Sequence, residues 1–217
     1  LYPARQVGGD LYDFFIHENT LFFAIGDVSG KGIPASLLMA STISLLRTLS
    51  SGSNSPSQIA YSLNNSIAER NEADMFVTFF IGMLDLRTGV MKYCNAGHTP
   101  PVLTSPDRTV AFFEMQSDLP LGILKNHDYQ EYTYRFVSGS GILLYTDGVT
   151  DAENEKNEFY TRERLLEIVT QNQELHPREF IRSIINDIQS HIKSHELSDD
   201  LSMLTFIYGS EWNIKKS

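Results

Sequence analysis

The chain has 217 residues, one cysteine and a formal net charge of −10 at pH 7. This length predicts one domain with a sizeable hydrophobic core. The acid excess argues against nucleic-acid binding, which needs a basic footprint, and against direct contact with an anionic membrane. The lone Cys94 excludes an internal disulfide and weakly indicates a reducing compartment. The longest apolar stretch, Met75 to Leu84, is far shorter than the ~20 residues of a membrane-spanning helix.

The expected elements form two blocks of strands, with helix pairs between and after them, which predicts an α+β layered fold. Strands at Leu11–Ile16 and Leu21–Gly26 come first, and Pro34 opens a helix that ends near Leu49. Ser55-Pro56-Ser57-Gln58 has the form of a capping box before a second helix. Further strands are expected at 76–85, 90–96, 101–104, 110–114, 129–136, 141–146 and 201–208, and further helices at 161–174 and 177–193.

Two aspartates flank the first pair of strands. A two-residue turn at Glu18-Asn19 pairs residues whose numbers sum to 37, which places Asp10 directly across from Asp27. Facing Cβ atoms in an antiparallel pair lie roughly 4.5–5.5 Å apart. Two carboxylates at that separation repel each other, so this pairing needs either a cation or a raised carboxylate pKa.

A second pair of carboxylates follows from the last strands. The apolar run Gly141–Thr146 ends at Asp147, and Asp199-Asp200 stands just before the run Leu201–Tyr208. If these runs are antiparallel neighbours, the end of one meets the start of the other, and the aspartates of both pairs converge at one edge of the sheets. A divalent cation is the simplest counter-charge, and an all-oxygen ligand set favours Mg²⁺ or Mn²⁺ over zinc.

Five short motifs occur in a fixed order along the chain. They are Val7-Gly8-Gly9-Asp10-Leu11-Tyr12-Asp13, Gly26-Asp27-Val28-Ser29-Gly30-Lys31-Gly32, Asn95-Ala96-Gly97-His98, Tyr145-Thr146-Asp147-Gly148 and Asp199-Asp200-Leu201-Ser202. Together they resemble the PPM family of metal-dependent Ser/Thr protein phosphatases, and more narrowly its bacterial SpoIIE/RsbU-type branch. The resemblance extends from Arg5 to about Tyr208.

The resemblance implies two stacked antiparallel β-sheets flanked by helices, an α-β-β-α sandwich, with two Mn²⁺ or Mg²⁺ ions at one edge. By matching motifs, Asp27 would bridge both ions, and the backbone carbonyl of Val28 would bind one of them. Asp147 and Asp199 would hold the other ion. Asp10 would bind directly or through a water molecule.

Three other polar residues are left with alternatives. In the family the last motif supplies its ligand from its first acidic position, here Asp199, so Asp200 would hold water molecules or cap the strand. Asp13 is either a solvated strand residue or a support for the metal ligands. Arg5 stands where eukaryotic relatives carry an arginine that binds substrate phosphate. This branch often lacks that arginine, so a plain surface residue is an equal alternative.

Three further features favour plainer interpretations. Gly30-Lys31-Gly32 has the form of an anion-binding nest before a helix, but a tight turn is the favoured interpretation. His98, followed by Thr99-Pro100-Pro101, fits a turn-stabilising residue better than a general acid. Cys94 lies in a strand-like run without a following Cys-x5-Arg phosphate loop, so it is not expected to be a nucleophile.

For function, the resemblance implies hydrolysis of phosphoserine or phosphothreonine by water activated between two metal ions. The implied substrate is a phosphorylated STAS-domain protein of the anti-anti-sigma type. Residues 1–209 would form the phosphatase domain, and 210–217 a charged tail. The chain starts without an initiator methionine, so we expect the output part of a longer cytoplasmic regulator that could be membrane-tethered upstream. Helices near 34–70 would act as switch elements and as a homodimer contact.

Two other functions compete with the phosphatase. A catalytically silent pseudophosphatase would bind a phosphorylated partner without hydrolysing it, but the intact set of aspartates argues against this. A structural calcium-binding domain would use a compact loop of alternating oxygen ligands, which the chain lacks. Manganese-dependent hydrolysis of a phosphomonoester distinguishes the three.

Overall fold

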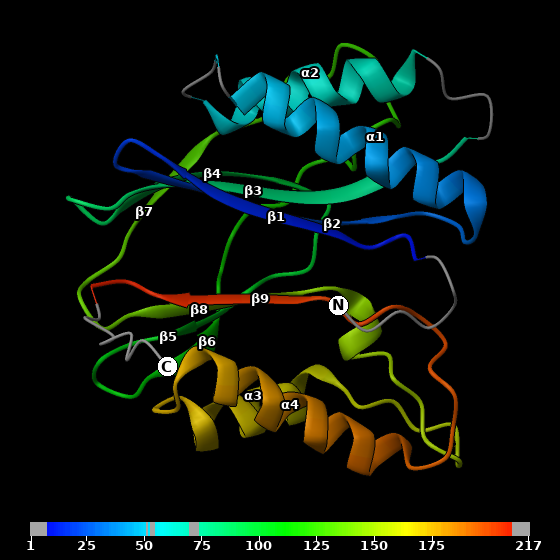
Figure 1. The fold of residues 1–217 in the computed structure, drawn as a ribbon, viewed down its shortest axis with the longest axis vertical. Helices are drawn as coiled ribbons and strands as arrows, with labels where there is room; N and C mark the ends of the chain where they lie inside the picture. Colours follow the sequence, from blue (N-terminus) through cyan, green and yellow to red (C-terminus); the bar gives the residue numbers. More distant parts are fainter. Residues whose placement is uncertain (1–7, 51, 53–54, 70–73, 210–217) are drawn as a thin grey trace, which may run out of the picture.

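The structure is a computed structural model that describes residues 8–50, 52, 55–69 and 74–209. Two antiparallel β-sheets lie face to face, and a pair of helices covers each outer face (Figure 1). The first sheet and its helices comprise β1 (Leu11–His17), β2 (Thr20–Val28), β3 (Val77–Asp85), β4 (Val90–Ala96), β7 (Tyr132–Arg135), α1 (Ile33–Ser50) and α2 (Pro56–Ala68). The second comprises β5 (Val102–Thr104), β6 (Val110–Phe112), β8 (Gly141–Tyr145), β9 (Met203–Ile207), α3 (Arg162–Asn172) and α4 (Pro177–Ile192). The predicted α-β-β-α sandwich is confirmed.

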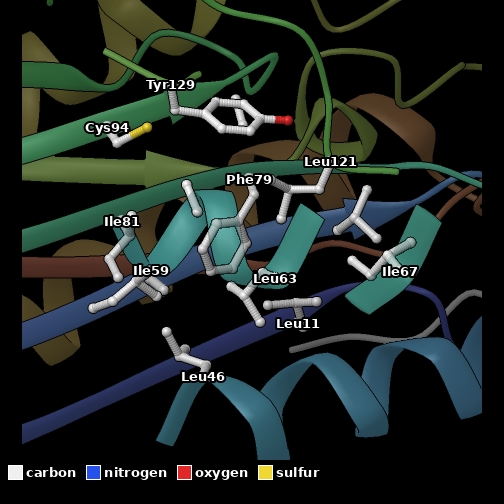
Figure 2. Close-up of a cluster of buried hydrophobic side chains, with 14 of the residues drawn as sticks. Leu11, Leu46, Ile59, Leu63, Ile67, Phe79, Ile81, Cys94, Leu121 and Tyr129 are labelled. Atoms are coloured by element: carbon white, nitrogen blue, oxygen red, sulfur yellow. The ribbon is translucent and has the colours of Figure 1, made fainter. Parts of the chain in front are cut away.

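Three clusters of buried apolar side chains fill the space between these layers. The cluster between the two sheets is rich in aromatic rings, including Phe23 and Phe80. A second cluster packs the first sheet against its helices, and Figure 2 shows Leu46 of α1, Leu63 of α2 and Phe79 of β3 within it. The third joins the second sheet to α3 and α4. Because β2 and β3 are buried on both faces, their sequences are almost continuously apolar instead of alternating.

The strand pairings bring four strand ends to one edge of the sandwich. The first sheet has the order β1-β2-β3-β4-β7, and the second has the order β6-β5-β8-β9. In the β1–β2 ladder Leu11 lies opposite Gly26, and the turn falls at residues 18–19, so the predicted register is confirmed. β8 and β9 are antiparallel neighbours, with Tyr145 opposite Met203, as predicted. The aspartates that flank these strands therefore gather at this edge.

An ion pair fixes α1 to the first sheet. Arg47, in the last turn of α1, donates from Nε and Nη2 to the two carboxylate oxygens of Asp13, at 2.7 and 2.8 Å. Asp13 is only 8% exposed, so the expectation of a solvated strand residue is wrong. Leu11, Asp13 and Phe15 all lie on the face of β1 that is turned toward the helices. The partner of Asp13 is therefore a helix and not the edge where the other aspartates meet.

Helix α1 is also long and apolar enough, by composition alone, to cross a membrane. The longest continuous apolar run in the sequence, 75–84, lies elsewhere, so this helix was not identified from the sequence as a candidate membrane span. In the fold α1 lies over the first sheet beside α2 and contributes Ala35 and Leu46 to the core (Figure 1). Only 28% of the helix is buried in this structure, so packing against the sheet accounts for part of its apolar composition.

The packing of the first sheet can be tested at Gly82. A Cβ atom there would lie 2.2 Å from the Phe23 ring, which is itself held against Phe80 and Phe206. We expect Gly82→Ala to lower the free energy of unfolding by about 1–3 kcal/mol, because the ring cannot move aside. Urea denaturation measures this, with Gly52→Ala as the control, since a Cβ there meets no atom within 4 Å. Equal stability of the two variants would contradict the packing.

Candidate metal centre

The two sheets are joined at the carboxylate edge by hydrogen bonds from Thr146. This residue directly follows β8, and its hydroxyl donates to Oδ2 of Asp10 at 2.8 Å. The same hydroxyl accepts from the N–H of Ser202, just before β9, at 3.1 Å. Asp147, the next residue, opens the short 3₁₀ helix η1 (Asp147–Val149). The aspartates of the first sheet and those of the second sheet therefore lie on opposite sides of the same polar boundary between the sheets.

Asp27 lies at the centre of the carboxylates. Burial raises its pKa to about 8, and the negative charges of Asp10, Asp147 and Asp199 add to the shift. Burial likewise raises the pKa of Asp10 to about 7, and these two side chains share a hydrogen bond. The pKa of Asp147 is raised too, mainly by burial. The structure therefore brings together the four aspartates that the sequence pointed to, and among the described residues a single salt bridge, from Lys31 to Asp199, offsets their charge.

Asp200 holds the backbone that leads into Asp10. Its Oδ2 accepts a hydrogen bond from the N–H of Gly9 at 2.8 Å, and the residue is only 5% exposed. Glycine is required around it, because a Cβ at Gly8 would lie 2.1 Å from Oδ2 of Asp200 and one at Gly148 would lie 2.1 Å from its carbonyl oxygen. This geometry supports a structural role for Asp200, close to the strand cap of the sequence analysis.

The carbonyl oxygen of Val28 lies on the same side as the Asp27 carboxylate. A Cβ at Gly9 would lie 3.1 Å from the Val28 oxygen and 3.5 Å from Oδ1 of Asp27. Both oxygens therefore border the Gly9 backbone, where a side chain would make a tight contact with the Val28 oxygen. This position is compatible with the carbonyl role that the motif implies for Val28.

Lys31 supplies a positive charge at the edge, which sequence spacing did not predict. Its Nζ lies 2.9 Å from Oδ2 of Asp199 and donates to the carbonyl of Ser198. Gly30 and Gly32 on either side both have positive φ, at 89° and 83°, so the segment is the tight turn that the sequence favoured. The turn points the lysine at a carboxylate, and this contact gives no support to the anion-nest alternative.

The donor set can be tested against the metals that the motifs imply. Within the described parts of the chain, no group of three or more Asp, Glu, His or Cys side chains is placed to hold an ion on its own. Mg²⁺ in proteins usually keeps several water ligands and takes only one or two carboxylates. The aspartates around Asp27 offer oxygen ligands only, and burial together with neighbouring negative charges raises the pKa values of Asp10 and Asp27. The residues therefore fit hard divalent cations of the Mg²⁺ or Mn²⁺ class.

Of three further candidate residues, His98 and Cys94 can be placed in the structure. His98 is buried, and burial lowers its pKa to about 4, so a neutral ring is present at pH 7 and cannot act as a general acid. The Cys94 thiol is buried in β4, and burial raises its pKa to about 12, which leaves it protonated and unreactive. Arg5 lies outside the described residues.

Residues 17–207 match the sequence model of the family described as Stage II sporulation protein E (SpoIIE). The chain belongs to the SpoIIE family. It is 30% identical over 203 residues to the phosphoserine phosphatase RsbU of Bacillus subtilis (strain 168). That alignment covers 93% of this chain but 60% of RsbU, so the chain spans only part of the length of this relative. The family and branch indicated by the five motifs are confirmed.

Solved structures support the same fold. The SiaA-PP2C domain of Pseudomonas aeruginosa superimposes with a TM-score of 0.84 at 17% identity, over 95% of this chain and 83% of that domain. RsbX, solved in complex with magnesium, gives a TM-score of 0.70 at 18% identity, over 94% of this chain and 90% of RsbX. At these identities the comparison establishes the PP2C fold alone.

The raised carboxylate pKa values predict how stability depends on pH. Asp27 binds its proton more tightly in the folded chain, with a pKa of about 8 against 3.8 for the ordinary side chain. Its stabilising contribution is complete below pH ~4 and is lost as pH rises through about 8. In EDTA we expect the thermal midpoint to fall between about pH 5 and pH 8, and saturating Mn²⁺ to remove much of this fall.

Differential scanning fluorimetry of wild type and two variants isolates this effect. Asp27→Asn should reduce the fall, because the amide does not ionise. Asp85→Asn, at the opposite end of β3, should retain it, since a turn with Arg87 and Thr88 lowers the pKa of Asp85. A thermal midpoint in EDTA with the same pH dependence in wild type and Asp27→Asn would contradict the assignment.

Proposed function

We propose that this domain is a metal-dependent protein Ser/Thr phosphatase. The observation that carries the proposal is the convergence of Asp10, Asp147 and Asp199 from both sheets on Asp27. Membership of the SpoIIE family and the similarity to the phosphoserine phosphatase RsbU support it. A cluster of carboxylates can hold cations for phosphoryl transfer, and that reaction is catalysed mainly by positioning and by electrostatic stabilisation.

The roles of the residues follow from their places at the edge. Asp27 would bind both ions, with the Val28 carbonyl on one of them, and Asp147 and Asp199 would hold the other. Asp10, oriented by the Thr146 hydroxyl, would bind directly or through water. Two Mn²⁺ or Mg²⁺ ions, when bound, would supply an activated water for in-line attack on phosphorus and positive charge for the phosphoryl oxygens.

Lys31 would also contribute to this site. It pairs with Asp199, and both side chains are partly exposed, at 43% and 40%. A divalent ion on Asp199 would compete with this ion pair, which would leave the ammonium group at the mouth of the site. There it would favour an anionic phosphate ester over neutral ligands. Asp200 would act one step away from the ions, by holding the Gly9 backbone.

For the biological substrate we propose a phosphorylated STAS-domain protein of the anti-anti-sigma type, in the cytoplasm. This follows from the SpoIIE/RsbU resemblance and not from a contact in the fold. The helices α1 and α2 would serve as the switch and homodimer elements in the same scheme. The pseudophosphatase alternative keeps the same partner but removes turnover, so the two functions differ in one measurable property.

Hydrolysis of p-nitrophenyl phosphate with Mn²⁺ tests the proposal. Asp27→Asn and Asp147→Asn should each lower kcat by about 10²–10³-fold, the loss typical of removing one preorganised electrostatic group. Asp85→Asn, a carboxylate at the far end of β3, is the matched control and should retain wild-type turnover. Turnover that needs no divalent ion, or that survives in Asp27→Asn, would contradict the metal phosphatase. Tight Mn²⁺ binding without turnover would favour the pseudophosphatase.

A further inference from the structure

The His98 side chain connects the two sheets immediately behind the carboxylate edge. It lies in the loop after β4 and is only 3% exposed. Its Nδ1 is 3.1 Å from the hydroxyl oxygen of Thr78 on β3, in the first sheet. Its Nε2 is 3.1 Å from the carbonyl oxygen of Tyr145, at the end of β8 in the second sheet. One imidazole ring therefore bridges the sheets by two directional contacts.

Both contacts of the ring are adjacent to candidate metal ligands. Thr78 is the direct partner of Asp27 in the β2–β3 ladder. Tyr145 lies two residues before Asp147. The path from Asp27 to Asp147 through His98 therefore consists of one rung of a sheet, two hydrogen bonds and two peptide units. These two aspartates come from different sheets, so their separation depends on how the sheets are held relative to each other.

The chemistry of the ring fits this bridging role. A backbone carbonyl can only accept, so Nε2 carries the hydrogen, and Nδ1 accepts from the Thr78 hydroxyl. A neutral histidine has one donor and one acceptor, and here both are used. Asn95 fixes the backbone of His98 from both sides, accepting from its N–H at 2.8 Å and donating to its carbonyl at 3.1 Å. The Thr99 hydroxyl donates to the same Tyr145 oxygen at 2.8 Å.

Apart from the hydrogen bonds at the edge itself, from Thr146 to Asp10 and from Gly9 to Asp200, the remaining contact between the sheets is largely apolar. The aromatic cluster around Phe23 and Phe80 fills the interior, and such packing is strong but non-directional. It holds the sheets together without fixing small sliding movements at their edge. Directional hydrogen bonds at the edge can fix them, and a metal site tolerates little error in ligand position.

We propose that His98 is a positioning residue that sets the separation of Asp27 and Asp147. The proposal rests on the function proposed above and extends it, because it names a residue that touches neither substrate nor ion. The position of His98 would control metal affinity through the two sheets. Loss of such an outer partner typically costs 10–100-fold in metal affinity or activity.

Substitutions at each end of the bridge test the proposal. His98→Leu removes both hydrogen bonds, and His98→Gln keeps an amide donor that can reach the Tyr145 carbonyl. Thr78→Val removes only the hydroxyl at the other end. We expect Mn²⁺ affinity, measured by isothermal titration calorimetry, to fall about 10–100-fold in His98→Leu and less in His98→Gln. The effects of His98→Leu and Thr78→Val should not add, because both break the same bridge.

The outcomes separate this proposal from a purely structural histidine and from the proposed function. All titrations are made at a temperature where each variant is folded by circular dichroism. A destabilised His98→Leu with wild-type Mn²⁺ affinity and kcat would overturn the positioning role and leave the phosphatase intact. If His98→Leu does not fold, wild-type Mn²⁺ affinity in both His98→Gln and Thr78→Val would overturn it in the same way. If the wild type binds Mn²⁺ but lacks turnover, weaker Mn²⁺ binding in His98→Leu would support the positioning role while contradicting the phosphatase.

Discussion

Repulsion between carboxylates at one edge of the sandwich is the constraint on which the rest of the site depends. Asp10 and Asp27 stand next to Leu11 and Gly26, the first pair of the β1–β2 ladder, and Asp147 and Asp199 approach from the second sheet. Burial raises the pKa values of the Asp10 and Asp27 side chains, and the negative charges of Asp10, Asp147 and Asp199 raise the pKa of Asp27 further. A divalent ion would offset this negative charge and make the same arrangement favourable.

Apart from Lys31, which pairs with Asp199, the hydrogen-bond donors that the structure describes around the edge carry no charge. The Thr146 hydroxyl orients Asp10, the Gly9 amide holds Asp200, and the neutral ring of His98 joins β3 to β8. Glycines at 8, 9 and 148 allow these close approaches, because a side chain at any of them would meet an atom of the site. Neutral donors orient the carboxylates without cancelling their charge, which leaves that charge available for metal ions.

The sequence predicted what depends on local or regular patterns. The Glu18-Asn19 turn set the β1–β2 register, and apolar runs ending in Asp147 and beginning after Asp200 set the β8–β9 pairing. Helix starts followed from Pro34 and from the Ser55 cap, whose hydroxyl accepts from the N–H of Gln58. These signals act within a few residues, or through strand alternation, so they can be read without the fold.

Contacts between distant segments could not be predicted in the same way. Asp13 pairs with Arg47, 34 residues away, and His98 with Tyr145, 47 residues away. No spacing in the chain identifies such partners, because they depend on how a helix lies on a sheet or how two sheets stack. The roles of the four aspartates as metal ligands likewise come from the family resemblance, and the fold adds only that they meet.

The most direct test of the central claim is a Mn²⁺ titration of the metal-free chain at pH 7. The titration is monitored by calorimetry in two buffers of different ionisation enthalpy. The account predicts that two ions bind and that protons are released, because the ions displace protons held by Asp10 and Asp27. Asp27→Asn should lose both the binding and the release. Mn²⁺ binding of equal strength in Asp27→Asn, or no binding at all in the wild type, would contradict a metal centre built on these carboxylates.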